Sequence, residues 1–271
     1  MLEILRAAAR TIEQGRAAAL ATIVATHGST PGKLGAKMLV RDDGSTVGTV
    51  GGGCTEADIW RIAMEVATTG RAQRATFRLT AATAAQTGLL CGGEFEVFVE
   101  PIVTTNVHIF GAGHIARSLA PLLLGLGCRV TVVDDRATFA SAEHFPAGVE
   151  TVVQDLDGAF SGLRLGPHSY VIIVTRGHEH DETVLAQAVR SEAGYIGLIG
   201  SRGKIGAIFK NLRAGGTPPS VLAKVHAPIG LDIGAQSPEE IAVSIAAEII
   251  AVRRGVTVPI RFPHAPEGSS G

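Results

Sequence analysis

From residue 107 onward, short apolar runs alternate with longer segments in which apolar residues recur at helical spacing. The short runs predict buried strands, and the longer segments predict helices. The expected strands cover 107–110, 129–133, 149–153, 170–174 and 195–198, and the expected helices cover 114–125, 182–191, 203–213 and 237–253. Strands that alternate with helices in this way are typical of a doubly wound parallel sheet of the Rossmann type.

The first hundred residues carry a different pattern, in which short strands prevail. An amphipathic helix is expected over residues 2–14, with Leu2, Leu5, Ala9 and Ile12 on one face. A second helix is expected over 55–68, and strands over 17–25, 37–41, 47–50, 75–79 and 94–100. In the last strand apolar residues alternate with glutamates, as in a half-solvated antiparallel strand. We therefore expect an α+β fold in this part.

The change of pattern predicts two domains with a linker near residues 101–106. A length of 271 residues agrees with two domains of ordinary size. We expect an N-terminal α+β domain over residues 1–103 and a Rossmann-like nucleotide-binding domain over 104–264. Residues 265–271 are expected to form a polar tail.

Composition narrows the function classes. Hydrophobic residues make up 46% of the chain, enough for a sizeable core, and the formal net charge is −1. Without a basic excess we expect no nucleic-acid partner, and without an apolar run of about 18 residues we expect no membrane span. The three cysteines, Cys54, Cys91 and Cys128, are too few for a disulfide scaffold and fit a reducing compartment. We therefore expect a cytoplasmic protein.

The most specific motif follows the strand at 107–110. Gly111, Gly113 and Ala116 form a Gly-x-Gly-x-x-Ala turn that opens a helix, and Asp134 ends the next strand. This order is typical of a dinucleotide-binding βαβ unit, in which the glycines admit a pyrophosphate and the acid accepts hydrogen bonds from a ribose. Two interpretations stay open, a bound nucleotide or a Rossmann fold that has lost its cofactor. The expected contacts of a nucleotide also include His114, Ile115 and Asp135.

Two further loops follow strands of the same sheet. Thr175 and Arg176 come after the strand at 170–174, and Gly200, Ser201 and Arg202 come after the strand at 195–198. Open α/β sheets bind ligands at the carboxyl ends of their strands, and a helix start with these side chains suits a phosphate. We therefore expect all five residues near a cofactor. Simple helix capping is the alternative for Ser201.

Neighbouring charged residues refine this expectation. The adjacent acids Asp134 and Asp135 disfavour a 2′-phosphate, so we expect NAD to bind better than NADP. His178, His180 and Asp181 are residue types that ligate metals, but alternate residues on a loop are weak support for a metal site. We expect them to cap a helix or contact a ligand, and we expect no bound metal ion.

A glycine-rich segment of the first domain suits an oxyanion. Residues 28–37 combine glycines, hydroxyls and two lysines, and they include Ser29 and Lys37. Backbone N–H groups can converge in such a loop while the lysines supply positive charge. The alternative is a tight turn whose lysines are solvated.

Two more segments of this domain bring cysteines next to glycines. Gly52 and Gly53 precede Cys54 at an expected helix start, where the helix dipole lowers the pKa of a thiol. Glu56 is placed to act as an acid–base group or a ligand partner. A small buried cysteine in a tight turn is the alternative. Cys91 and Gly92 form a similar element, whereas Cys128 is expected in the core.

Together these segments resemble the XdhC/CoxI family of xanthine dehydrogenase accessory factors, over nearly the whole chain. One local departure is Gly32-Lys33, which stands where an arginine is expected after Thr-Pro; lysine is a point charge and not a bidentate fork. The resemblance rests on the Rossmann turn and on the segments 28–31, 35–38, 48–56, 91–93, 175–178, 196–202 and 228–234.

The resemblance implies a role in the maturation of molybdenum hydroxylases. Members of the family are thought to bind the molybdenum cofactor (molybdopterin), protect it during sulfuration and pass it to the apoenzyme. The implied partners are a hydroxylase apoenzyme and a cysteine desulfurase, and we expect a homodimer. Cys54 and Cys91 match the two family cysteines. The candidate contacts of the molybdenum cofactor are Ser29, Lys37, Gly52, Gly53, Cys54, Glu56, Cys91 and Gly92.

Two other functions stay open. The chain is an NAD(P)-dependent oxidoreductase if Cys54 or His114 lies near a nicotinamide, or a non-catalytic adaptor if the fold only presents a surface. No Lys-His or Tyr-Lys pattern marks a general acid or base in the second domain. We therefore expect an accessory factor without hydride-transfer turnover of its own.

Overall fold

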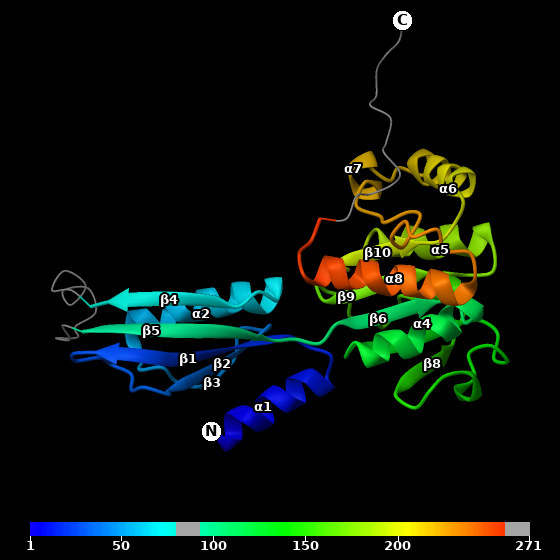
Figure 1. The fold of residues 1–271 in the computed structure, drawn as a ribbon. Helices are drawn as coiled ribbons and strands as arrows, with labels where there is room; N and C mark the ends of the chain where they lie inside the picture. The colour runs from blue at the N-terminus through cyan, green and yellow to red at the C-terminus, as the bar shows by residue number, and fades with distance from the viewer. Residues whose placement is uncertain (80–92, 258–271) are drawn as a thin grey trace, which may run out of the picture. The chain divides into compact units, whose positions relative to one another are not determined.

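The computed structural model describes residues 1–79 and 93–257 (Figure 1). The chain divides into two compact units, Met1–Thr104 and Thr105–Gly271. Each unit has its own sheet and its own hydrophobic core, and each is described by itself. Cys91, Gly92 and the polar tail at 265–271 lie outside the described residues.

The first unit is built on a five-stranded antiparallel sheet, which confirms the α+β expectation. The strand order is β3-β2-β1-β5-β4. Helix α2 (Gly53–Thr69) covers one face, where Ile59, Ala63 and Val66 pack in the core with Ile23 and Val97. The strands are β1 (Ala18–His27), β2 (Lys37–Arg41), β3 (Thr46–Gly48), β4 (Gln73–Arg78) and β5 (Glu94–Ile102).

Helix α1 (Leu2–Glu13) packs on β1 and β2 from the opposite face of this sheet. Ile4, Ala7 and Thr11 are its buried residues. Leu2 and Leu5 are 61% and 55% exposed, so the apolar face that the sequence favours is not the face in contact with the sheet. The expected contact face is wrong because the helix buries the side that contains Thr11, a polar residue. Thr11 can be buried because its hydroxyl donates to the carbonyl of Ala7 at 2.9 Å, within the same helix.

The second unit holds a five-stranded parallel sheet in the order β10-β9-β6-β7-β8. The chain runs from β6 outward through β7 and β8, and then returns to the other side of β6 for β9 and β10. The reversal between β6 and β9 is the switch point where sheets of this kind bind ligands. The strands are β6 (Asn106–Phe110), β7 (Arg129–Asp134), β8 (Val149–Val153), β9 (Ser169–Ile173) and β10 (Tyr195–Leu198).

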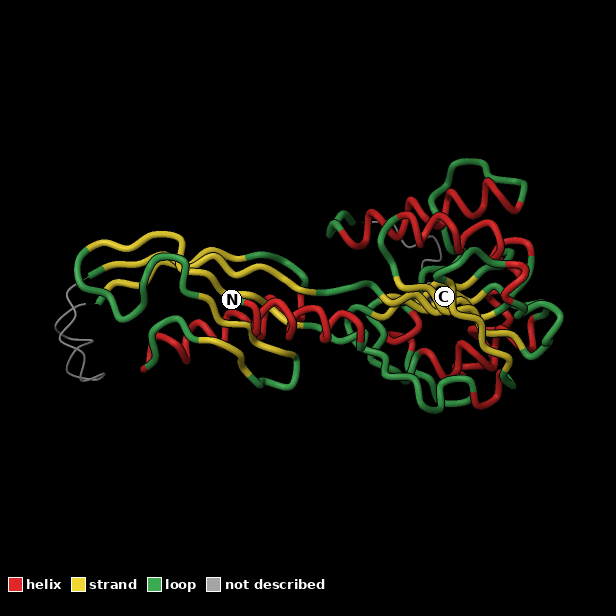
Figure 2. Tube along the Cα trace, turned by 90° about the horizontal axis from the view of Figure 1, so that it is seen from below, coloured by secondary structure: helices red, strands yellow, loops and turns green. Residues whose placement is uncertain are grey.

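Helices cover both faces of this sheet, as Figure 2 shows by the strands that lie between two helical layers. Ile109 faces a core that it shares with α4 (His114–Gly125) and α8 (Pro238–Arg253). Phe110, the next residue, faces the core of α5 (His178–Ala188) and α6 (Arg202–Ala214). The two cores on alternate sides confirm the doubly wound prediction.

A few boundaries differ from the sequence-based expectations. Helix α5 begins at His178, four residues before the expected start, because its polar first turn contains Asp181, which is fully buried. The link between the sheets is only residues 103–105. A short helix, α7 (Pro219–Leu222), and the 3₁₀ turns Ala142–His144 and Leu156–Gly158 were not expected.

Among the described helices, none has the length and apolar character needed to span a membrane.

Candidate functional site

The glycine-rich turns of the first unit meet at one end of its sheet. A Cβ atom on Gly51 would lie 2.6 Å from the backbone N of Gly32, and one on Gly93 would lie 2.4 Å from the carbonyl O of Ser29. Neither distance is sterically allowed, so glycine permits both contacts. The 28–37 segment therefore touches both the 49–53 turn and the residue that follows Cys91 and Gly92.

Glu56 holds the 49–53 turn in place. Its Oε2 accepts hydrogen bonds from the Thr49 hydroxyl at 2.5 Å, from Gly52 N at 2.9 Å and from Val50 N at 3.2 Å. Burial raises the pKa of Glu56, but these three hydrogen bonds outweigh it and hold the pKa below its ordinary value. Glu56 is therefore a charged acceptor that fixes the turn.

The other candidates of the first unit are placed as follows. Cys54 lies in the first turn of α2, which begins at Gly53. Gly52 has φ +76°, and a Cβ there would meet nothing within 4 Å, so this side of the turn is open. Ser29 is exposed. Lys37 lies in β2, and its ammonium donates to the Thr22 hydroxyl at 2.7 Å.

In the second unit the Gly-x-Gly turn lies at the switch point. A Cβ on Gly111 would come within 2.4 Å of the Val174 carbonyl O, so this glycine lets the end of β6 lie against the segment after β9. Gly113 is the N-cap of α4, and a Cβ there would meet nothing within 4 Å. His114 and Ile115 follow in the first turn of α4, His114 exposed and Ile115 packed against the core.

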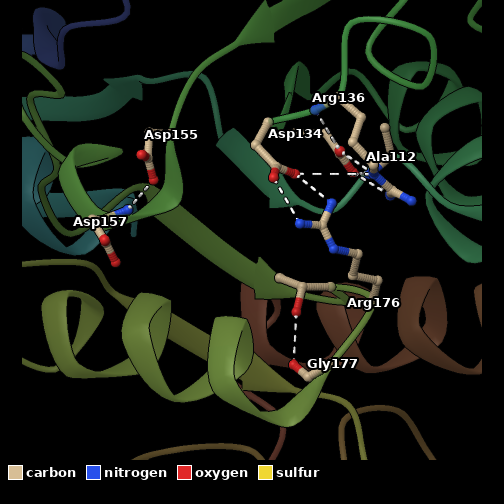
Figure 3. A network of polar contacts seen from close by, with 9 residues as sticks. Ala112, Asp134, Arg136, Asp155, Asp157, Arg176 and Gly177 are labelled. Atoms are coloured by element: carbon tan, nitrogen blue, oxygen red, sulfur yellow. Dashed lines mark hydrogen bonds and ion pairs between the residues drawn. The ribbon is translucent and has the colours of Figure 1, made fainter.

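Asp134 is already saturated with hydrogen bonds (Figure 3). Its Oδ2 accepts from Ala112 N at 2.8 Å, which ties the end of β7 to the glycine-rich turn. The backbone N and the guanidinium of Arg136 donate to both carboxylate oxygens at 2.8 to 3.0 Å. Burial raises the pKa of Asp134, but the hydrogen bonds from Arg136 and Ala112 outweigh it and lower the pKa to about 2.

The next residue, Asp135, pairs with Arg176. Both guanidinium nitrogens Nη1 and Nη2 donate to the two carboxylate oxygens, each at 2.8 Å. Arg176 follows β9 and Asp135 follows β7, while β6 lies between these strands. In Figure 3 the Arg176 side chain reaches toward the acidic segment after β7. The ion pair therefore crosses the carboxyl end of β6, where the glycine-rich turn starts.

A third acid connects the ends of β9 and β10. Asp181, in the first turn of α5, accepts from the Thr175 hydroxyl at 2.5 Å and forms an ion pair with Lys204 of α6. Burial dominates and raises the pKa of Asp181 in spite of Lys204 and Thr175. Lys204 also lines a cavity of about 380 Å³ between α5 and α6. The other lining residues are His178, Glu182, Ala207, Ile208 and Asn211.

The structure gives structural roles to some predicted site residues. The Ser201 hydroxyl accepts from Lys204 N at 3.3 Å and so caps α6, which begins at Arg202, and Gly200 comes directly before this cap. Cys128 is buried in the core, as expected. Among the side chains that the structure describes, in residues 1–53, 55–79 and 93–257, no three His, Cys, Asp or Glu are grouped to hold a metal ion. The sequence analysis did not predict the ion pair of Arg136 with Asp134, because it assigned the Asp134 carboxylate to a ribose.

Known proteins match both units. The profile of the XdhC Rossmann domain matches residues 107–249, and the profile of the XdhC and CoxI family matches residues 11–79. The crystal structure of a xanthine dehydrogenase from Bacillus halodurans aligns with a TM-score of 0.50 and 23% identity, and covers 93% of this chain and 95% of that chain. At this identity the alignment shows a shared fold.

Three curated relatives extend the match. The uncharacterized protein YqeB of Escherichia coli is 32% identical over 98% of this chain, and a probable xanthine dehydrogenase component of Bacillus subtilis is 35% identical over 55%. The chain spans only 49% and 43% of these two proteins. The molybdenum cofactor insertion chaperone PaoD of Escherichia coli is 24% identical over 92% of this chain and 88% of its own length. Because the Rossmann profile alone matches more than half of the residues, the chain belongs to the XdhC/CoxI family.

Proposed function

We propose that the protein is an accessory factor that binds the molybdenum cofactor during maturation of a molybdenum hydroxylase of the xanthine dehydrogenase type. In this role it holds the cofactor as cargo while a sulfur ligand is added, and then passes it to the apoenzyme. Family membership supports the proposal, as does the similarity to a relative named as a molybdenum cofactor insertion chaperone. We propose further that it has no hydride-transfer activity of its own.

The observation that carries the proposal is the meeting of the glycine-rich turns in the first unit. The contacts of Gly51 with Gly32 and of Gly93 with Ser29 bring together three segments that are far apart in sequence. The cargo is a pterin dithiolene with a phosphate, and it needs oxyanion donors and soft ligands. The first N–H groups of α2 lack intrahelical partners and supply donors beside the open side of Gly52.

Deletion of the gene tests this function in the cell. We expect the client hydroxylase to be present at normal abundance but with low activity, and with its molybdenum cofactor absent or unsulfurated. The measurements are client activity per unit of protein, molybdenum content and cyanide-labile sulfur. Normal client activity in the deletion strain contradicts the proposal.

We also propose a cysteine desulfurase as the sulfur-donating partner and a homodimer as the working form. The exposed apolar stripe of α1, which contains Leu2, Leu5 and Ile12, supports a surface that pairs with another protein or a second copy. Sedimentation of the purified protein, alone and with a desulfurase, measures both associations.

A second candidate function, nucleotide binding by the second unit, is favoured by the open face of Gly113 at the switch point. The oxidoreductase alternative requires NAD(P) there and turnover of a small substrate. Calorimetric titration with NAD, NADP, ATP and GTP tests binding. Oxidation of NAD(P)H by the purified protein on a small substrate, together with normal client activity in the deletion strain, favours the oxidoreductase.

A further inference from the structure

The two adjacent acids after β7 play different parts. Asp134 is 4% exposed in its side chain, and its oxygens are taken by Ala112 N and by Arg136. An acid in this state has no capacity left for a ribose hydroxyl. Asp135 is 30% exposed, and its bonds go to the Arg176 guanidinium, whose side chain is 40% exposed.

The Arg176–Asp135 pair lies where a ligand of this fold has to enter. A pyrophosphate binds at the N-terminus of the helix that follows the first strand, which here is α4 after Gly113. The pair crosses the carboxyl end of β6 immediately before this helix. A phosphate at the turn therefore competes with Asp135 for the same guanidinium, and the Arg fork fits phosphate as well as carboxylate.

We propose that the Arg176–Asp135 ion pair is a latch that a pyrophosphate-containing nucleotide opens by exchange. The phosphate takes the place of the Asp135 carboxylate on Arg176, and the released Asp135 accepts the ribose hydroxyls that Asp134 has no capacity to accept. This inference rests on the proposed nucleotide binding by the second unit. No covalent bond changes, because the step exchanges one anion for another on a fixed cation.

The latch opens at low cost. Both partners are partly solvated, and an ion pair of this kind contributes little to stability. The only other cation recorded near Asp135 within the described residues is Arg136, whose Nε is 3.9 Å away and is already hydrogen-bonded to Asp134. Arg136 also stacks on the Phe139 ring at 3.7 Å, so it stays in place when Arg176 leaves.

Calorimetric titration of the full chain with inorganic pyrophosphate and with NAD tests the latch. Asp135→Asn frees Arg176, so we expect it to bind pyrophosphate about 2- to 5-fold more tightly than the unmodified protein. Arg176→Gln removes the phosphate partner, so we expect it to bind pyrophosphate about 10-fold more weakly. Asp135→Asn should also lower the ratio of NAD affinity to pyrophosphate affinity, because it loses the ribose acceptor.

Asp43→Asn is the matched control, because Asp43 forms a comparable exposed ion pair with Arg16 in the first unit. It should leave both affinities unchanged. Tyrosine signals from Tyr170 and Tyr195 verify that the second unit of each variant is folded. If Asp135→Asn binds pyrophosphate no more tightly than the unmodified protein, including the case in which neither binds it, the latch is rejected. Tighter pyrophosphate binding with no NAD binding by any variant supports the exchange of phosphate for Asp135 on Arg176 and overturns NAD as the ligand that makes it.

Discussion

A carboxylate holds a glycine-rich turn in each unit, but the remaining partners differ. In the first unit Glu56 accepts from the turn itself, through the Thr49 hydroxyl and the N–H groups of Val50 and Gly52. In the second unit Asp134 accepts one N–H of the turn and then the Arg136 guanidinium. Asp135 pairs with Arg176, which follows β9, and Asp181 pairs with Lys204 of α6.

The difference indicates two ways of preparing a binding surface. The first turn is held by neutral donors of the same segment, and the first N–H groups of α2 come directly after it. The carboxyl edge of the second sheet is closed by ion pairs between side chains. An anionic ligand can exchange with such pairs, and salt weakens those that are exposed.

The largest effect is expected where two turns touch. Gly51→Ala places a Cβ 2.6 Å from Gly32 N at φ +124°, so we expect the first unit to lose about 3 kcal/mol of unfolding free energy. Urea unfolding followed by the fluorescence of Trp60, the only tryptophan of the chain, measures this loss of unfolding free energy. Gly52→Ala is the control: its φ is +76° but its Cβ has open space, so a loss of about 1 kcal/mol is expected. Equal losses in the two variants contradict the contact.

A smaller effect is expected at Asp134. The fall of its pKa from an ordinary 3.8 to about 2 corresponds to about 2 kcal/mol of stability. Because the folded pKa is the lower one, this stability is present above about pH 4 and is lost as the pH falls toward 2. Asp134→Asn should lower the unfolding free energy by about this amount at neutral pH, and it should make the unfolding free energy fall less between about pH 4 and 2. Tyrosine absorbance reports on the second unit, which contains both tyrosines, and measures the unfolding free energy at each pH.

Its neighbour Asp135 should behave differently. Asp135→Asn breaks one partly exposed ion pair, so we expect a loss of about 0.5 kcal/mol, which vanishes in about 1 M salt. The same tyrosine signal measures it. A loss as large as that of Asp134→Asn rejects the distinction between an anchoring acid and an exchangeable one.

The smallest effect is expected on the outer side of α1. Leu5 is 55% exposed, so Leu5→Ala should change the unfolding free energy of the monomer by less than about 0.5 kcal/mol. Ile4→Ala on the buried side should cost about 2 kcal/mol. If the loss of unfolding free energy caused by Leu5→Ala instead grows as the protein concentration rises, the stripe is a contact between copies. Denaturation at several protein concentrations separates these outcomes.

The Rossmann unit was largely predictable, because continuous apolar runs and a Gly-x-Gly turn leave few alternatives for Val107 to Asp134. The face of α1 was not predictable, since Thr11 is buried only by bonding to its own helix. The start of α5 was missed because its polar first turn points Asp181 inward. No local pattern links Asp135 to Arg176, which are 41 residues apart and meet only through the strand order.

The same limit applied to the first unit. The sequence identified each glycine-rich segment separately. The contact of Gly93 with Ser29 depends on the pairing of β1 with β5, and the contact of Gly51 with Gly32 depends on the path of the chain into α2. Neither contact could be predicted from a local pattern. Whether Cys91 takes part stays a prediction, because it lies outside the described residues.

We propose that the Cys54 and Cys91 thiols of the first unit hold the molybdenum cofactor, and cofactor content per folded protein tests this proposal most directly. The oxidised pterin is measured by fluorescence in protein purified from cells that make the cofactor, for the unmodified chain and for Cys54→Ser, Cys91→Ser and Cys128→Ser. We expect Cys54→Ser and Cys91→Ser to retain less cofactor while remaining folded. Cys128→Ser, in the core of the second unit, should retain as much as the unmodified chain. Unchanged content in both Cys54→Ser and Cys91→Ser contradicts the account.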